Sequence, residues 1–88
     1  MSRKQHDLKI MPEYFEAIMK GEKNFEVRFN DRNFAKGDIL LLREHDGREF
    51  TGRTITAEVT YILDNPAYCK EGYIIMAIKV ITHGADTL

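Results

Sequence analysis

The sequence predicts a small α+β domain, a mixed β-barrel of about five or six strands with one short helix near the N-terminus. Three observations indicate this fold. A helical stripe of apolar residues occurs once, early in the chain; segments rich in Thr, Ile, Val and Tyr dominate the remainder; and turn residues separate those segments at short intervals. With 88 residues the chain is expected to form one domain, with a core over about residues 6–81 and a frayed tail over 82–88.

A first short strand and the helix are expected in the first quarter of the chain. Leu8 and Ile10 alternate with polar neighbours, as in a strand. Pro12 follows, and its fixed φ suits the first position of a helix. Gly21 suits the position just after a helix ends. We therefore expect one helix over residues 12–20, too short to persist unless it packs on a sheet.

The second strand, over about residues 23–29, has two faces of opposite character. Its apolar residues recur with a period of two, which predicts a half-buried strand. The apolar face is formed by Phe25, Val27 and Phe29, and the polar face by Asn24, Glu26, Arg28 and Asn30. Same-face neighbours on a strand are about 7 Å apart, so two charged residues there can bind one small polar partner together.

The middle of the chain predicts turns around one strongly apolar strand. Residues 30–38 are rich in Asn, Asp and Gly, which favour turns. Ile39–Arg43 is apolar almost throughout, which predicts a strand buried on both faces. Asp46-Gly47 then predicts a hairpin.

Two further β segments complete the expected barrel. Residues 50–63 form a long β-rich stretch in which Gly52 permits a bulge or bend. Residues 64–72 form an irregular segment, and Tyr73–Ile81 is the expected last strand.

Composition excludes several classes of function. A formal net charge of −1 argues against a protein that coats nucleic acid through positive charge alone, although a local basic groove stays possible. Cys69 is the only cysteine, so no intrachain disulfide forms. The three histidines are widely separated and no nucleotide-binding glycine motif occurs, so we expect neither a metal site nor a cofactor. The N-terminus lacks the apolar core of a signal peptide and no run reaches about 20 apolar residues, so a cytoplasmic protein without membrane contact is expected.

The segment after the helix carries a recognisable motif, Gly21-x-Lys23-x-x-Glu26-x-Arg28. It resembles the G-x-K-x-x-E-x-R signature of the ASCH superfamily, whose fold is a PUA-like β-barrel. A later Gly-Asp turn, at residues 37–38, is also typical of these barrels, and the pattern over residues 8–80 is similar to a compact branch of uncharacterised bacterial and phage proteins. The resemblance implies a cleft between helix and barrel and a role in binding RNA or modified nucleotides.

The three charged residues of the motif suit recognition of a nucleotide. Lys23 supplies a mobile positive charge for a phosphate, and Arg28 offers a planar fork that binds phosphate or stacks on a base. Glu26, when ionised, only accepts hydrogen bonds and so selects an exocyclic amino group. The simpler alternative is that Glu26 and Arg28 bridge to neighbouring strands while Lys23 is solvated.

Four more residues are candidates for the nucleic-acid-binding site. Asn30 and Arg32 follow the charged strand and could line the mouth of the cleft, although turn chemistry alone also explains Asn30. Tyr61 and Tyr73 are possible stacking platforms for bases, although aromatic residues in strands more often belong to the core.

The leading hypothesis is a binding module for RNA or a nucleotide-like small ligand, and the near-neutral charge favours the small ligand. The alternative is a small amidohydrolase acting on a modified nucleoside such as acetylated cytidine, with Lys23 as nucleophile or base and Glu26 assisting proton transfer. One enzyme branch of the superfamily catalyses that reaction with a lysine, a threonine and a glutamate. This sequence has Glu26 where the threonine is expected, which favours binding over hydrolysis. A third hypothesis is a module that contacts another protein.

Overall fold

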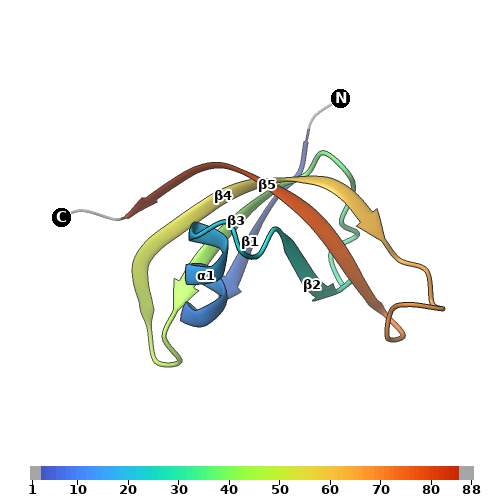
Figure 1. Cartoon of the computed structure of the whole chain (residues 1–88), viewed down its shortest axis with the longest axis horizontal. Helices are drawn as coiled ribbons and strands as arrows, with labels where there is room; N and C mark the ends of the chain where they lie inside the picture. Colours follow the sequence, from blue (N-terminus) through green and yellow to red (C-terminus); the bar gives the residue numbers. More distant parts are fainter. Residues whose placement is uncertain (1–2, 86–88) are drawn as a thin grey trace.

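The computed structural model describes residues 3–85 and shows a five-stranded sheet that curls into a half-barrel (Figure 1). The elements are β1 (Gln5–Ile10), α1 (Pro12–Met19), β2 (Phe25–Phe29), β3 (Ile39–His45), β4 (Phe50–Leu63) and β5 (Tyr73–Ala85). The strand order is β1-β3-β4-β5-β2; β1 and β3 are parallel, and all other neighbours are antiparallel. The predicted α+β class with one short helix is therefore confirmed, and β1 and β2 are the two edges of the sheet.

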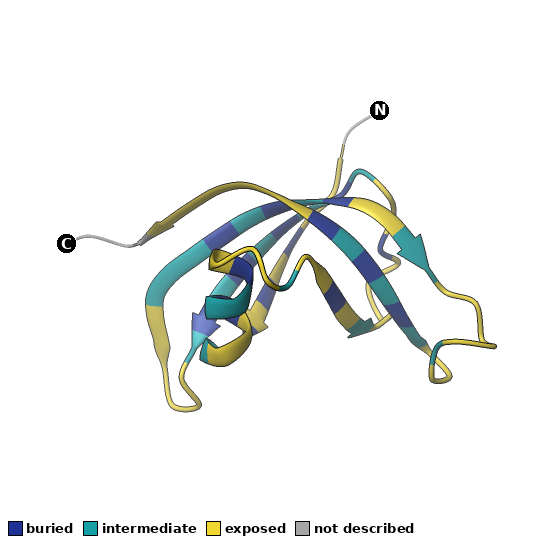
Figure 2. Cartoon of the chain, viewed as in Figure 1, coloured by how far each residue is buried: buried dark blue, intermediate teal, exposed yellow. Residues whose placement is uncertain are grey.

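The core lies on the concave side of the half-barrel. Buried residues alternate with more exposed ones along the strands (Figure 2). Helix α1 adds Phe15 and Ile18 to this core. Because eight residues are too few for a stable isolated helix, α1 depends on this packing. Within the described residues, no helix has the length and apolar character needed to cross a membrane.

The apolar strand β3 is buried on one face, and the prediction of two buried faces is wrong. Leu40 and Leu42 are fully buried, whereas Ile39 and Leu41 retain partial exposure. The reason is that the half-barrel has one core, and within residues 3–85 no second layer covers the convex face of β3 (Figure 2).

The last strand continues past Ile81, where the sequence predicted its end. Thr82 pairs with Thr56, and the pairing continues to Ala85 opposite Arg53. Residues 82–85, expected in a frayed tail, therefore belong to the sheet because the long strand β4 offers them partners. The remaining tail, residues 86–88, lies outside the described residues.

The bulge predicted at Gly52 is present. Arg43 pairs with Thr54, but His45 pairs with Phe50, so β4 has extra residues between these two pairs. Gly52 has a φ of 93° at this point, a conformation that favours glycine.

Strand β2 is oriented with its polar face toward the interior, opposite to what its half-buried pattern implies. Phe25, Val27 and Phe29 are 41%, 50% and 54% exposed, whereas Glu26 is 4% exposed. The register with β5 explains this orientation: Glu26 lies opposite Met76 and Arg28 opposite Ile74. Opposite residues of an antiparallel pair share a face, and Met76 and Ile74 are core residues.

A buried polar pair joins the start of β1 to the loop before β3. His6 Nε2 lies 2.9 Å from Asp38 Oδ2, which also accepts a hydrogen bond from the Ala35 N–H at 3.0 Å. Burial by itself would raise the pKa of Asp38, but the hydrogen bonds from His6 and Ala35 outweigh it and lower the pKa below its usual value. The pair thus fixes the Gly37-Asp38 turn against the first strand.

Candidate ligand-binding site

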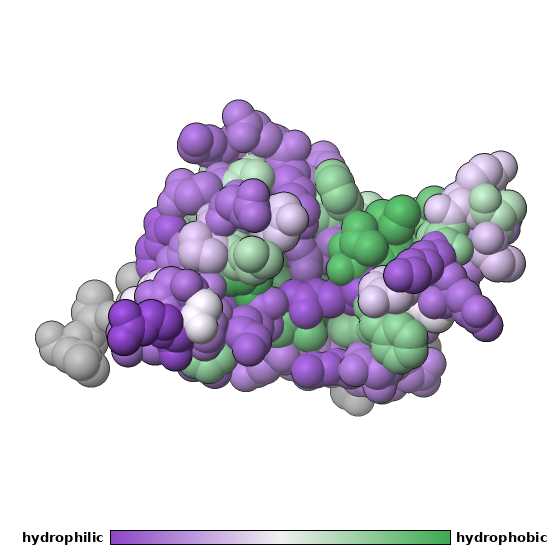
Figure 3. Space-filling view, turned by 90° about the horizontal axis from the view of Figure 1, so that it is seen from below, coloured by the Kyte–Doolittle hydropathy of each residue, from purple (hydrophilic) through white to green (hydrophobic). Residues whose placement is uncertain are grey.

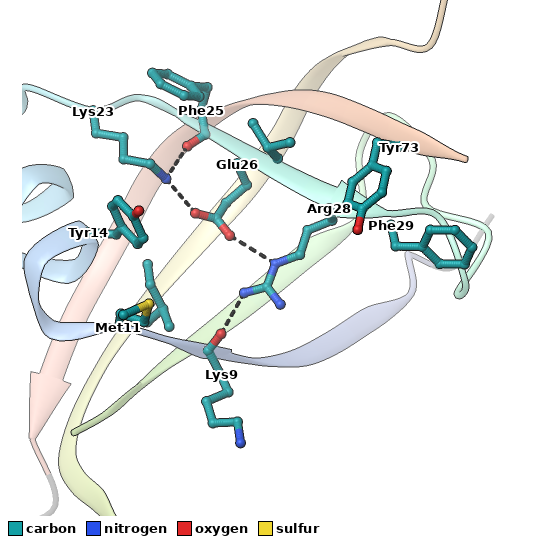
Figure 4. A pocket seen from close by; sticks show the side chains of 11 residues that line it. Lys9, Met11, Tyr14, Lys23, Phe25, Glu26, Arg28, Phe29 and Tyr73 are labelled. Carbon is teal, nitrogen blue, oxygen red and sulfur yellow. Dashed lines mark hydrogen bonds and ion pairs between the residues drawn. The ribbon is translucent and has the colours of Figure 1, made fainter. Parts of the chain in front are cut away.

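The inward face of β2 brings the three charged residues of the motif together. Lys23 Nζ donates to Glu26 Oε1 at 2.6 Å, and Arg28 Nε donates to Glu26 Oε2 at 3.1 Å (Figure 4). The Glu26 side chain is 6% exposed, against 15% for Lys23 and 26% for Arg28. A nearly buried carboxylate is therefore held between two cations that still reach solvent, and the group carries one net positive charge.

Lys23 has further partners that fix its position. Its Nζ atom donates to the backbone carbonyl of Phe25 at 2.7 Å. The same atom lies 5.4 Å from the ring centroid of Tyr14 and 5.0 Å from that of Phe25. These distances are within the range of cation–π attraction, so the ammonium group is held between α1 and β2.

Two arginines bridge the edges of the half-barrel. Arg28 Nη2 donates to the carbonyl of Lys9 at 2.6 Å, and Arg32 Nη1 donates to the carbonyl of Asp7 at 2.8 Å. The Lys4 carbonyl accepts from β3, so alternation directs the carbonyls of Asp7 and Lys9 to the free edge of β1. Arg28 on β2 and Arg32 in the loop that follows it thus bond to the edge of β1 where a neighbouring strand would otherwise pair.

A cavity of about 670 Å³ lies beside the charged residues, between β1, α1 and β2. Its walls include the aromatic side chains of Tyr14, Phe25, Phe29 and Tyr73, together with Lys9 and Met11. Seen from below, the open side of the molecule shows hydrophobic surface bordered by hydrophilic surface (Figure 3). Small-molecule sites are typically about 300–1,000 Å³, largely apolar, with a few polar groups that orient the ligand. The cavity has both properties.

The structure gathers four of the seven predicted binding residues at this cavity: Lys23, Glu26, Arg28 and Tyr73. Asn30 instead accepts a hydrogen bond from the Phe34 N–H at 3.1 Å, as turn chemistry requires. Arg32 bonds to β1 and is not among the residues that line the cavity.

Tyr61, the remaining candidate, lies apart from the cavity. It is 61% exposed and pairs with Ala77, which in turn pairs with Phe25. Tyr61 therefore lies on the face of the sheet opposite to Glu26, and it is not among the described residues that line the cavity.

Sequence reasoning missed the aromatic and basic residues that complete the walls. Tyr14 precedes the buried Phe15, which places it beside the apolar stripe of α1, and Lys9 lies between Leu8 and Ile10 on the outward face of β1. Both positions could be found from their periodicity. Phe25 and Phe29 could not, because their apolar character predicted the core.

The donor set of the cavity does not match a metal site. Among the described residues that line the cavity, Glu26 is the one carboxylate, and its two oxygens already accept hydrogen bonds from Lys23 and Arg28. Within residues 3–85, no three His, Cys, Asp or Glu side chains gather in a way that could hold a metal ion.

The part of the chain that forms this cavity matches one known protein family. Residues 5–78 match the family described as "Domain of unknown function (DUF3850)". The chain belongs to the DUF3850 family. It is also 39% identical, over 64 residues, to the "Uncharacterized 12.9 kDa protein in GpA 3'region" of Escherichia phage P2. That alignment covers 73% of this chain and 59% of the phage protein, so the chain matches less than two thirds of that relative's length. The matched DUF3850 residues include every residue that lines the cavity.

One glycine of the DUF3850 domain, Gly72, packs closely against the Phe29 ring in the cavity wall. Gly72 has a φ of 82°, and a Cβ atom there would lie 2.6 Å from Phe29 Cε1. We expect Gly72→Ala to lower the free energy of unfolding by about 2 kcal/mol, because it adds backbone strain and displaces the Phe29 ring. Urea denaturation measures the effect. Gly47→Ala is the matched control, since Gly47 has a φ of 99° but open space around it. Equal losses in the two variants would show that the ring moves away freely.

Proposed function

We propose that this DUF3850 domain is a binding module for a nucleotide, either free or as an unstacked base of RNA. The observation that carries the proposal is the convergence of Lys23, Glu26 and Arg28 on a cavity with aromatic walls. A nucleotide combines an anionic phosphate, a planar base and exocyclic hydrogen-bonding groups, and each of these has a counterpart in the cavity.

The unused hydrogen-bonding capacity of the charged residues supports this assignment. Arg28 uses Nε and Nη2 within the protein, while its Nη1 has no partner among residues 3–85. Lys23 uses two donors of three, and Glu26 has lone pairs left on both oxygens. A phosphate thus finds donors on Lys23 and Arg28, and an exocyclic amino group finds an acceptor on Glu26. Stacking on an aromatic wall would add about 1–3 kcal/mol per base.

We further infer that the DUF3850 half-barrel is a variant of the PUA-like barrel of ASCH domains. The curled sheet with one early helix is compatible with that fold. The motif residues of the ASCH resemblance, Lys23, Glu26 and Arg28, are also the charged residues of the cavity.

Titration with the four nucleoside monophosphates tests the proposal, by calorimetry and by backbone amide chemical shifts. We expect saturable binding of at least one nucleotide, with shifts concentrated at the cavity. Lys23→Met should raise the dissociation constant about tenfold, because it removes one charge-assisted contact to phosphate. Lys20→Met is the control, since Lys20 is exposed and does not line the cavity. The proposal fails if none of the four nucleotides and no short RNA binds, or if both variants bind as the wild type does.

A second candidate function is hydrolysis of an acetylated nucleoside. The observation that favours it is the 2.6 Å contact of Lys23 Nζ with Glu26 Oε1 beside the cavity, within reach for proton transfer. Incubation with acetylated cytidine would release cytidine and acetate by addition of water across the amide bond. If the wild type releases cytidine and Lys23→Ala does not, the domain is an enzyme that uses Lys23. If the wild type releases no cytidine, this second candidate is wrong and the binding module is the remaining proposal.

A further inference from the structure

The cavity of about 670 Å³, here called the central cavity, adjoins a second cavity near the loop of residues 64–72. A neighbouring cavity of about 380 Å³ shares Val27 and Tyr73 with it and is also lined by Tyr68 and Lys70. Because the two cavities share wall residues, they lie next to each other at the edge strand β2, and the pair is here called the β2 groove.

The far end of the β2 groove presents an exposed aromatic ring on an ordered turn. Tyr68 is 75% exposed. Its backbone N–H donates to the carbonyl of Asn65 at 2.9 Å, and the Cys69 N–H donates to the same carbonyl at 3.0 Å. Asn65 Oδ1 also accepts from the Ala67 N–H at 2.8 Å. The turn thus holds the tyrosine backbone in place, which lowers the entropy lost when the ring stacks on a ligand.

The same end of the groove carries a positive charge. Lys70 Nζ lies 5.7 Å from the ring centroid of Tyr73, the residue shared by both cavities. Cations and aromatic rings in alternation are what proteins use to bind the phosphates and bases of a single strand.

The opposite end of the central cavity is unsuited to phosphate. A third cavity, of about 330 Å³, shares Lys9 and Met11 with it but is lined by Asp46. Hydrogen bonds from the backbone N–H groups of Glu49 and Arg48 lower the pKa of Asp46 below its ordinary value. Its negative charge repels a phosphate, so the surroundings of the central cavity are electrostatically asymmetric.

We propose that the β2 groove binds single-stranded nucleic acid that runs from the central cavity to Tyr68 and Lys70, and not toward Asp46. One nucleotide occupies the central cavity, the next base stacks on Tyr68, and a phosphate lies near Lys70. This inference rests on the proposed function and extends it from one nucleotide to a strand.

Fluorescence anisotropy with labelled hexanucleotides, RNA and DNA, and calorimetry with mononucleotides test it. We expect a hexanucleotide to bind at least tenfold more tightly than a mononucleotide. Tyr68→Ala and Lys70→Ala should each weaken hexanucleotide binding about fivefold or more and leave mononucleotide binding unchanged, because stacking contributes about 1–3 kcal/mol per base. Lys36→Ala is the control, since it removes the same charge from an exposed position outside these cavities.

The outcomes separate the two proposals. Mononucleotide binding with an equally weak hexanucleotide, or with Tyr68 and Lys70 variants that behave as the wild type, overturns the strand inference and leaves the central site standing. Absence of both kinds of binding overturns both. A preference for the RNA hexamer supports the inference with a contact to the 2′-hydroxyl, and equal affinity supports it for either kind of single strand.

Discussion

Glu26→Gln is expected to lower the free energy of unfolding by about 3 kcal/mol, the low end of what loss of one partner costs a buried ion pair. Glutamine keeps the shape of the side chain but removes the charge that holds Lys23 and Arg28 at 2.6 and 3.1 Å. Two like charges then face each other beside the core without the carboxylate between them. Urea denaturation measures the loss, and chemical shifts of the cavity residues report whether the site keeps its geometry.

The size of this effect decides what kind of ion pair the DUF3850 domain contains. Exposed pairs contribute about 0–1 kcal/mol. Glu22→Gln is the matched control, because Glu22 is an exposed acid just before the same strand. A loss below about 1 kcal/mol in Glu26→Gln would show that water screens the three charges as it does at a surface. Such a result would contradict the interpretation of Glu26 as a buried partner of Lys23 and Arg28.

Arg53→Met is expected to lower the free energy of unfolding by about 2 kcal/mol at neutral pH. Glu44 is 3% exposed and receives two hydrogen bonds of 2.8 Å from Arg53, from Nε and Nη2. The variant leaves this buried carboxylate with Thr51 as its partner. The loss stays below the ~3–5 kcal/mol of a fully buried pair because Arg53 is 42% exposed and water can replace part of it. Arg48→Met, at an exposed position, is the control.

The same pair predicts how stability depends on pH. The hydrogen bonds from Arg53 lower the pKa of Glu44 below its ordinary value of 4.5. A carboxyl whose pKa is lower in the folded state stabilises the fold above the unfolded pKa, and that stabilisation is lost as the pH falls through the folded value. Without Arg53, the hydrogen bond from Thr51 alone opposes burial, which acts to raise the pKa of Glu44. Unfolding measured over a series from neutral to acid pH should therefore show stability declining at a higher pH in Arg53→Met; coincident profiles would contradict the role of Arg53.

Local patterns predicted the elements of this domain well because each has a local physical cause. Pro12 and Gly21 mark the ends of the helix region, and Gly52 marks the bulge in β4. The parallel pairing of β1 with β3 had no such signal, since it joins strands separated by the helix and β2. The face of β2 was likewise decided by its register with β5 and not by its own alternation.

The charged part of the candidate site could be predicted, and its apolar part could not. Lys23, Glu26 and Arg28 lie within six residues, so spacing alone indicated that they could act together. Tyr14 comes from α1 and Tyr73 from β5, and only the folded chain brings them to the same cavity. Arg32 was predicted to bind a ligand but has a structural role instead. Its bond to the Asp7 carbonyl joins the loop after β2 to β1, and no residue near Arg32 in the sequence indicated that bond.

The two guanidinium bridges to β1, one from β2 and one from the loop after it, have a consequence for how the cavity admits a ligand. In a closed barrel the separation of neighbouring strands is fixed at about 4.8 Å by their shared ladder. Here two arginine side chains bond to β1 carbonyls in place of such a ladder, and Arg28 is also bonded to Glu26. Because side chains and not a backbone ladder make these bonds, breaking them requires no loss of pairing between any two strands of the sheet.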